Sequence, residues 1–287
     1  MSEPADIPNE KRKLFFGLFV FPLIIAVGMA VLLCAAVLLT HEKETPESLI
    51  AALKKSAPSK RWQKAFELSN ELNHATPAIR ENGVLKEIIL ILRDAERYDT
   101  KTRGYMALAL AHFHGPDAVN ALRDSLKDED ENVRLFSLWA LGALGAREAA
   151  PDLLPFIKSG SADSRKTAAY VLGAIGESSA RAELTSLLSD PVQDVRWNAA
   201  LALARLGDDA GLAVLTEMLE RDRLSLRYHM EETQIEAVMT NAAKGLALIR
   251  RPEAFKILET VSRNDRSLKV RQAALNALQF YSEKPNS

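Results

Sequence analysis

The feature of this sequence that most constrains its fold is a repeated pattern, seen best in residues 190–207, D-P-V-Q-D-V-R-W-N-A-A-L-A-L-A-R-L-G. The frame anchored on Arg196 falls on Arg165 and Arg134 at two steps of 31 residues. Further steps carry the frame to Arg103, Arg61, Met239 and Arg271, which makes about seven repeats. A fixed period of this kind predicts an α-solenoid, in which each unit buries its apolar face against its neighbours.

Each unit is predicted to be a pair of helices, helix A, a short turn and helix B. Proline opens several segments, and Gly145, Gly176 and Gly207 fall where a helix should stop. In helix B of the fifth unit, the apolar residues recur at helical spacing, at Ala199, Ala200, Leu203 and Leu206. No stretch alternates with period two, so the sequence predicts an all-α fold without a sheet.

The arginine that begins each frame lies near the apolar stripe of helix B, where an unpaired charge is costly. In three units an aspartate precedes the arginine by six residues. We expect these side chains to form a ladder through the stack, with each guanidinium bound to carboxylates or turn carbonyls. This is a structural role, not a catalytic one, for Arg134, Arg165, Arg196, Arg271, Asp128, Asp190 and Asp265.

A run without any charged residue extends from Leu14 to Thr40. As a helix it would be about 40 Å long, which exceeds the roughly 30 Å of a bilayer core. A cleaved signal peptide is the first alternative, but its apolar region is usually about 7 to 15 residues long. A lipoprotein signal is the second, but the bulky Leu33 precedes Cys34 where a small residue is expected. We therefore predict an uncleaved transmembrane anchor at 14–40.

The charges that flank this run suggest its orientation. Lys11, Arg12 and Lys13 lie directly before it, whereas Lys43 is the one basic residue close behind it. This favours a cytoplasmic N-terminus and a periplasmic solenoid in a bacterial inner membrane. The predicted segments are a disordered tail at 1–13, the anchor at 14–40, a linker at 41–45, the solenoid at 46–282 and a disordered tail at 283–287.

Composition excludes several functional classes. The formal net charge is -1, so no basic surface attracts nucleic acid. One cysteine and five histidines leave no zinc-finger type of cage, and His112 and His114 project about 200° apart on a helix. No P-loop, dinucleotide fingerprint or nucleophile elbow is present. The sequence predicts no cofactor, no metal and no enzymatic activity.

The pattern D-P-x-x-x-V-R-x-x-A-A-x-A-L-x-x-L-G at 190–207, and more loosely at 128–145 and 159–176, resembles HEAT-like repeats of the phycobilisome-lyase type. The resemblance covers roughly residues 46–282. It implies an α-solenoid with a concave surface made by the B helices and, most often, a scaffold or adaptor role. It also allows a bilin lyase or isomerase acting on a tetrapyrrole-protein substrate, against which the membrane anchor argues.

Two sets of residues are candidates for partner binding. Positions +1 and +5 from the frame arginine point away from the core stripe, and all three tryptophans fall there. The candidates on this predicted concave face are Trp62, Phe66, Trp139, Lys166, Tyr170 and Trp197. The alternative is that these side chains fill gaps between adjacent B helices. An insertion at 220–234 offers a second set, Arg227, Tyr228 and His229.

These observations predict a membrane-anchored scaffold or adaptor that binds a segment of a partner protein in the concave face. A membrane transport or envelope assembly is a natural setting for such a scaffold. Two other functions stay open at this point, the lyase-type enzyme and a purely structural spacer. The sequence does not name the partner protein.

Overall fold

The computed structural model describes residues 16–40, 45–73 and 83–283. Its contacts divide the chain into two units, Met1–Thr45 and Pro46–Ser287. The predicted tail at 1–13, all but the last residue of the predicted linker at 41–45, and residues 284–287 of the predicted tail at 283–287 lie outside the described residues. The predicted segment limits therefore remain predictions, although the last helix continues to Glu283, one residue beyond the predicted end of the solenoid.

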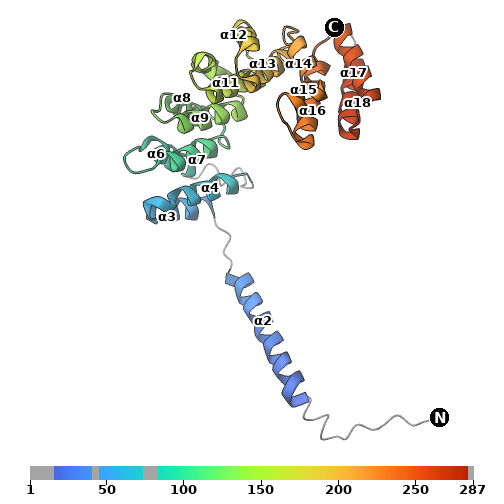
Figure 1. Cartoon of the computed structure of the whole chain (residues 1–287). Helices are drawn as coiled ribbons and strands as arrows, with labels where there is room; N and C mark the ends of the chain where they lie inside the picture. Colours follow the sequence, from blue (N-terminus) through green and yellow to red (C-terminus); the bar gives the residue numbers. More distant parts are fainter. Residues whose placement is uncertain (1–15, 41–44, 74–82, 284–287) are drawn as a thin grey trace, which may run out of the picture. The chain divides into compact units, whose positions relative to one another are not determined.

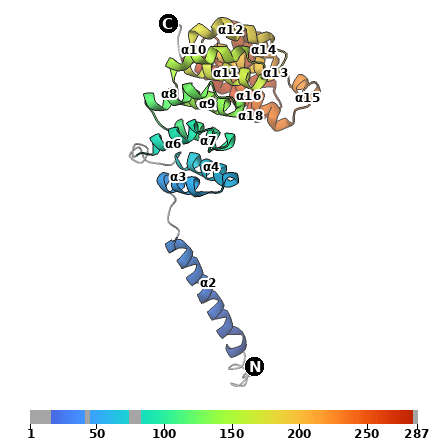
Figure 2. The ribbon, with the colours of Figure 1, turned by 90° about the vertical axis from the view of Figure 1, so that its left-hand side faces the viewer.

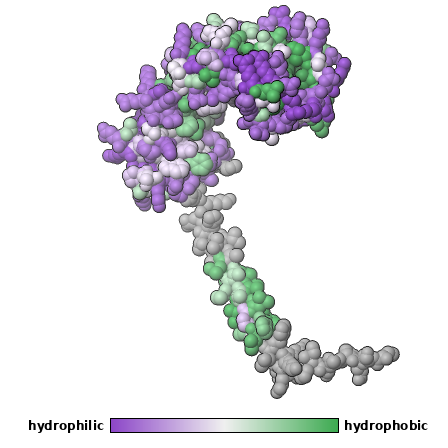
Figure 3. All heavy atoms as spheres, in the orientation of Figure 1, coloured by the Kyte–Doolittle hydropathy of each residue, from purple (hydrophilic) through white to green (hydrophobic). Residues whose placement is uncertain are grey.

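The first unit is a single apolar helix. A short π-helical turn, Phe16–Val20, leads into α2, Phe21–Thr40. The stretch Phe16–Leu33 has a mean hydropathy of 2.7, and none of it is buried. Figure 3 shows α2 as almost uniformly hydrophobic. Its length and composition suit a membrane span, and a signal sequence would have the same properties.

The second unit consists of stacked helix pairs, and its described residues contain no strand, which confirms the predicted all-α solenoid (Figures 1 and 2). The A helices are α3 (Pro46–Lys55), α6 (Val84–Arg93), α8 (Pro116–Ser125), α10 (Ala150–Leu153), α12 (Arg181–Ser186), α14 (Leu212–Glu217) and α17 (Pro252–Asn264). The B helices are α4 (Arg61–Glu71), α7 (Thr100–Leu110), α9 (Glu131–Leu144), α11 (Ala162–Ile175), α13 (Gln193–Arg205), α16 (Glu232–Leu248) and α18 (Leu268–Glu283). Short 3₁₀ turns flank three of the A helices, at Pro58–Lys60, Arg147–Ala149, Leu154–Lys158, Ser178–Ala180 and Leu187–Ser189.

Local sequence signals fix where the helices begin and end. The side chain of Asp130 accepts hydrogen bonds from two backbone N–H groups in the first turn of α9, and the Ser161 side chain accepts one from the Ser164 N–H in α11. Gly145 and Gly176 end these helices with φ values of 65° and 74°, in the left-handed region that favours glycine. Helix α13 begins at Gln193, two residues after Pro191. The Asp190 carboxylate accepts a hydrogen bond from the Val192 N–H at 2.9 Å, which holds Pro191 in a turn.

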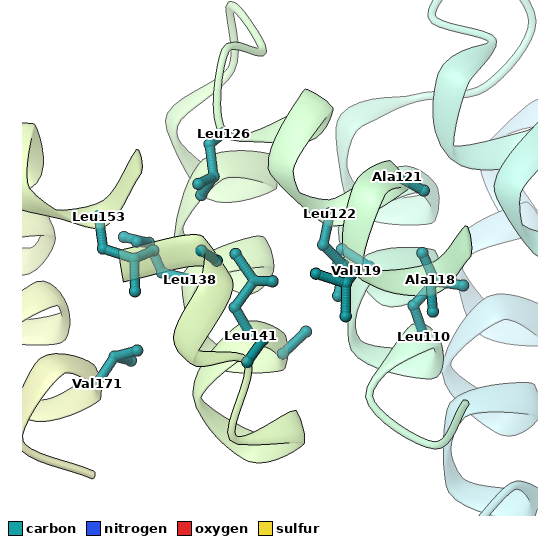
Figure 4. Packing of buried hydrophobic residues seen from close by; sticks show 14 of the residues in the cluster. Leu110, Ala118, Val119, Ala121, Leu122, Leu126, Leu138, Leu141, Leu153 and Val171 are labelled. Atoms are coloured by element: carbon teal, nitrogen blue, oxygen red, sulfur yellow. The ribbon is translucent and has the colours of Figure 1, made fainter. Parts of the chain in front are cut away.

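Apolar side chains from both helix layers form the core. Figure 4 shows Leu122 of α8, Leu138 and Leu141 of α9 and Val171 of α11 packed between successive pairs. The buried residues fall into two clusters, and α13 contributes to both of them. Its Ala199, Ala202 and Leu203 belong to the first cluster, whereas Trp197, Ala200 and Ala204 belong to the second.

An additional short helix interrupts the sixth pair. Helix α15, Arg221–Leu226, lies between α14 and α16, inside the insertion expected at 220–234. Leu224 is fully buried, so the insertion packs against the solenoid.

Candidate functional site

The B helices carry a row of side chains at the fifth position after the frame residue, and we call it the B-helix face. Its members on α4, α9, α11, α13 and α16 are Phe66, Trp139, Tyr170, Leu201 and Lys244. Phe66 is 45% exposed and Trp139 is 43% exposed, although both are large apolar side chains. Such side chains mark interaction surfaces when they gather on one face.

Ring contacts join this face into aromatic groups. The Trp139 and Tyr170 rings lie 4.9 Å apart, and the Arg205 guanidinium lies 5.0 Å from the centre of the Tyr170 ring. At the other end of the row, Phe66 meets Tyr105 edge to face at 5.4 Å. Tyr105 in turn stacks on Phe136 at 6.0 Å.

Two further candidates for the concave face, Trp62 and Lys166, directly follow the frame arginine and are half-buried. Trp62 lies on α4 with the Lys101 ammonium 5.6 Å from its ring centre. Lys166 donates to the Asp163 carboxylate at 2.8 Å. Both are already engaged within the chain.

Trp197 does not line an open surface, so that part of the expectation is wrong. Its side chain is only 5% exposed and meets Tyr228 of the insertion edge to face at 5.7 Å. The +1 position of a B helix faces neighbouring elements, as the half-buried Leu135 on α9 also shows. The alternative interpretation, packing between elements, holds for Trp197.

The three candidate residues of the insertion also include both packing and exposed side chains. The Tyr228 hydroxyl donates to Glu217 at 3.0 Å, and its ring covers Trp197. Arg227 lies over the Tyr228 ring at 5.7 Å and is exposed. His229 is exposed with φ of 51°, which is uncommon for a residue other than glycine. Tyr228 is therefore the packing residue, and Arg227 and His229 are the accessible ones.

The arginines and aspartates make a ladder whose direction the sequence did not show. Arg165 forms a two-point contact with Asp190 of the next unit, at 2.7 and 3.0 Å. Arg103 pairs with Asp128 in the same way, again 25 residues ahead. The Arg165 guanidinium holds the pKa of the Asp190 carboxyl below its usual value.

The arginine of the same unit binds the backbone of this turn instead. Arg134, Arg196 and Arg271 donate to the carbonyl oxygens of Asp128, Asp190 and Asp265, at 2.6, 2.7 and 2.7 Å respectively. Each turn aspartate is thus held twice, once by its side chain and once by its carbonyl.

The last rung has a different origin. Residue 240, which lies 25 residues before Asp265, is a threonine. Arg221 of the insertion takes the place of the missing arginine and donates to the Asp265 carboxylate at 2.6 and 3.3 Å. The repeat pattern places Arg103 in the frame, but it did not identify Arg103 or Arg221 as a rung of the ladder. The sequence signal that identifies Arg103 is an arginine 25 residues before a turn aspartate.

A groove lies between α13 and α16 beside Tyr170. Its volume is about 350 Å³. The side chains that line it include Asn198, Leu201 and Arg205 of α13 and Asn241, Lys244 and Leu248 of α16. Within the described residues, no three His, Cys, Asp or Glu side chains gather as a metal site would require.

Solved structures share this architecture. The chain matches the complex of CpcE and CpcF of phycocyanin lyase from Nostoc sp. PCC7120 with 21% identity, 84% coverage of this chain, 96% of that chain and a TM-score of 0.56. It matches YibA of Escherichia coli with 17% identity, 83% and 93% coverage and a TM-score of 0.52. At these identities the likeness concerns the fold alone. Human deoxyhypusine hydroxylase matches with 17% identity, 83% and 85% coverage and a TM-score of 0.36, which supports no argument about activity.

Comparison with curated proteins gives no match. The model of the HEAT repeats matches residues 85–170 and 150–233, so it spans more than half of the chain. The helix pairs, the turn aspartates and the arginine rungs described above lie largely within these residues. On this evidence, the chain belongs to the HEAT-repeat family.

Proposed function

We propose that this protein is a membrane-anchored scaffold that binds a segment of a partner protein along its B-helix face. The observation that carries the proposal is Trp139, a large side chain that is 43% exposed in the middle of helix α9 and whose ring lies 4.9 Å from that of Tyr170. Tryptophan and tyrosine contribute much of the binding energy of protein interfaces. The exposed part of this side chain does not contribute to the core of the protein. A bound partner segment would cover it.

The apolar helix supports the membrane part of the proposal. None of the Phe16–Leu33 stretch is buried against the rest of the protein. Exposed apolar surface of this extent is costly in water and stable in a bilayer. We infer that the helix remains attached and places the solenoid at a bacterial inner membrane, with the N-terminus in the cytoplasm and the repeats in the periplasm. Confinement to the membrane raises the effective concentration of the scaffold near a membrane-bound partner.

A photo-crosslinking experiment in native cells tests the binding face. A benzoylphenylalanine placed at Trp139 should crosslink to one or a few defined proteins, and Trp139→Ala should reduce their co-purification. The matched control carries the crosslinker at Lys127, which is exposed after the A helix α8. Equal crosslinking from the two positions, or no crosslinks from Trp139, would show that the B-helix face is not the binding surface.

Fractionation tests the anchor separately. The full-length mass should persist in the membrane fraction after alkaline carbonate washing, because a spanning helix resists extraction. A shorter protein in the soluble fraction would show instead that the apolar helix is a cleaved signal sequence.

A further inference from the structure

The groove between α13 and α16 has a structural cause. On the preceding interface, between α11 and α13, a Cβ added to Gly173 would lie 2.6 Å from the Cα of Ala202. Those two helices therefore pack with their backbones almost in contact. Between α13 and α16, Leu201 and Lys244 are among the residues that line the groove of about 350 Å³.

The groove is cationic. Arg205 and Lys244 both line it and are exposed, and none of the residues that line it carries a carboxylate. Among the ion pairs of the described residues, none involves Arg205 or Lys244, whereas other exposed arginines such as Arg93 and Arg251 do have carboxylate partners. Two positive charges without acidic neighbours favour an anionic ligand.

The groove also offers hydrogen-bonding amides. Asn198 donates to the carbonyl oxygen of Asp194 at 2.8 Å, which holds its side chain against its own helix. Asn241 lies across the groove on α16 and is exposed. Side-chain amides can donate to and accept from the backbone of an extended peptide.

An aromatic side chain also lines the groove. Tyr170 has the Trp139 ring 4.9 Å and the Arg205 guanidinium 5.0 Å from its own ring centre. An aromatic ring beside cationic groups is a ready contact for an apolar side chain of a ligand. The positive charges, the amides and the aromatic ring of the groove together suit a peptide that carries carboxylates beside an apolar residue.

We propose that this groove binds an extended acidic segment of the partner protein, with Arg205 and Lys244 each facing a carboxylate and Tyr170 facing a neighbouring apolar side chain. This inference rests on the proposed function and names the chemistry of the partner. Guanidinium and ammonium groups bind carboxylates through charge-assisted hydrogen bonds. Because both cations are exposed, salt should weaken the binding, since the screening length is about 8 Å at physiological ionic strength.

The test uses the full chain in a zwitterionic detergent and twelve-residue peptides that carry a neutral dye. One peptide alternates glutamate and leucine, a second has glutamine in place of glutamate, and a third has lysine. Fluorescence anisotropy should show that the glutamate peptide binds. The glutamine peptide should bind at least about tenfold more weakly, and the lysine peptide should not bind. Equal binding of the glutamate and glutamine peptides would overturn the proposal.

Charge reversal locates the site. R205E/K244E should weaken binding of the glutamate peptide by about tenfold or more. The control K127E/K256E makes the same change in net charge at two exposed positions outside the groove and should bind as the wild type does. R205Q/K244Q, with neutral side chains of similar size, gives the same answer if the reversal prevents folding. Equal weakening in the groove and control variants would overturn the assignment.

Other polyanions must be distinguished from a peptide. Binding of a single-stranded DNA oligonucleotide as tight as that of the glutamate peptide, and lost in R205E/K244E, would overturn the peptide assignment. The two proposals fail separately. Crosslinks from Trp139 in cells without binding of the acidic peptide would refute only the present inference, whereas the absence of those crosslinks refutes the proposed function.

Discussion

Arg221 of α15 and Asp265, which lies between α17 and α18, form a two-point ion pair with the shorter contact at 2.6 Å. The Arg221 side chain is 13% exposed and the Asp265 side chain is 9% exposed, so the pair is largely removed from water. The contact fastens the insertion to the turn before α18. It also supplies the rung that the repeat itself lacks at Thr240.

Arg221→Ala should therefore destabilise the C-terminal pairs by about 2–4 kcal/mol, because it leaves the Asp265 carboxylate buried without its partner. Urea denaturation followed by circular dichroism measures this loss. The double variant R221A/D265N should lose less than the sum of the two single variants. Arg266→Ala is the control, since Arg266 is 69% exposed and its pair with Glu232 should contribute less than about 1 kcal/mol. Similar losses for Arg221→Ala and Arg266→Ala would contradict the prediction.

The pair of Arg165 and Asp190 predicts a dependence of stability on pH. The hydrogen bond from Arg165 lowers the pKa of Asp190, so the ionised carboxyl stabilises the folded state. This contribution is fully present above the unfolded pKa of about 3.9 and is lost as the pH falls through the folded pKa. Asp190→Asn should cost about 2–3 kcal/mol at pH 7, and the difference from wild type should shrink below about pH 4.

The free energy of unfolding measured between pH 2 and pH 7 checks this expectation. Asp163→Asn is the matched control, because the Asp163 side chain is 68% exposed and its pair with Lys166 lies at the surface. A constant difference between Asp190→Asn and wild type over the whole range would contradict the assigned ion pair.

The two tryptophans Trp139 and Trp197 should respond in opposite ways to truncation. Trp197→Ala should destabilise the protein by about 3–5 kcal/mol, because it removes a buried side chain between α13 and the insertion. Trp139→Ala should change stability by less than about 1 kcal/mol while reducing partner binding. Thermal unfolding of the two variants separates these effects, and the prediction fails if Trp139→Ala proves the more destabilising.

Gly173→Ala should destabilise the stack by about 1–3 kcal/mol, since the new Cβ meets the backbone of Ala202 and not a flexible side chain. Gly160→Ala is its control, because a Cβ added at Gly160 has no atom within 4 Å. Equal stability of the two variants would mean that α11 and α13 are farther apart than the structure places them.

The sequence was sufficient to predict the features that depend on local spacing. The helix pairs follow from apolar residues at helical intervals, and Gly145 ends α9 as expected. The Ala199–Ala200 pair is buried for the same reason. Periodicity was enough here because neighbouring units contact each other in a regular order.

Features that depend on contacts between units were beyond this approach. The angular position of a residue around its B helix shows whether the side chain points away from the A helix of the same unit. It does not show whether another element covers that side chain. Trp197 was therefore expected on an open face, although Tyr228 covers it. The sequence could not show whether the Asp190 carboxylate pairs with Arg165 of the preceding unit or with Arg196 of its own unit, because both arginines reach the same turn.

The division of the core within α13 has a consequence for how the solenoid opens. Some alanines of α13 belong to the first cluster and others to the second. The helix pairs on one side of α13 can therefore unfold while the core on the other side stays buried. Backbone amides of α16 and α18 should then exchange with deuterium as one cooperative block, and those of α7 to α11 as another. The amides of α13 should exchange with the slower block, because this helix is shared by both clusters and lies at the boundary between them.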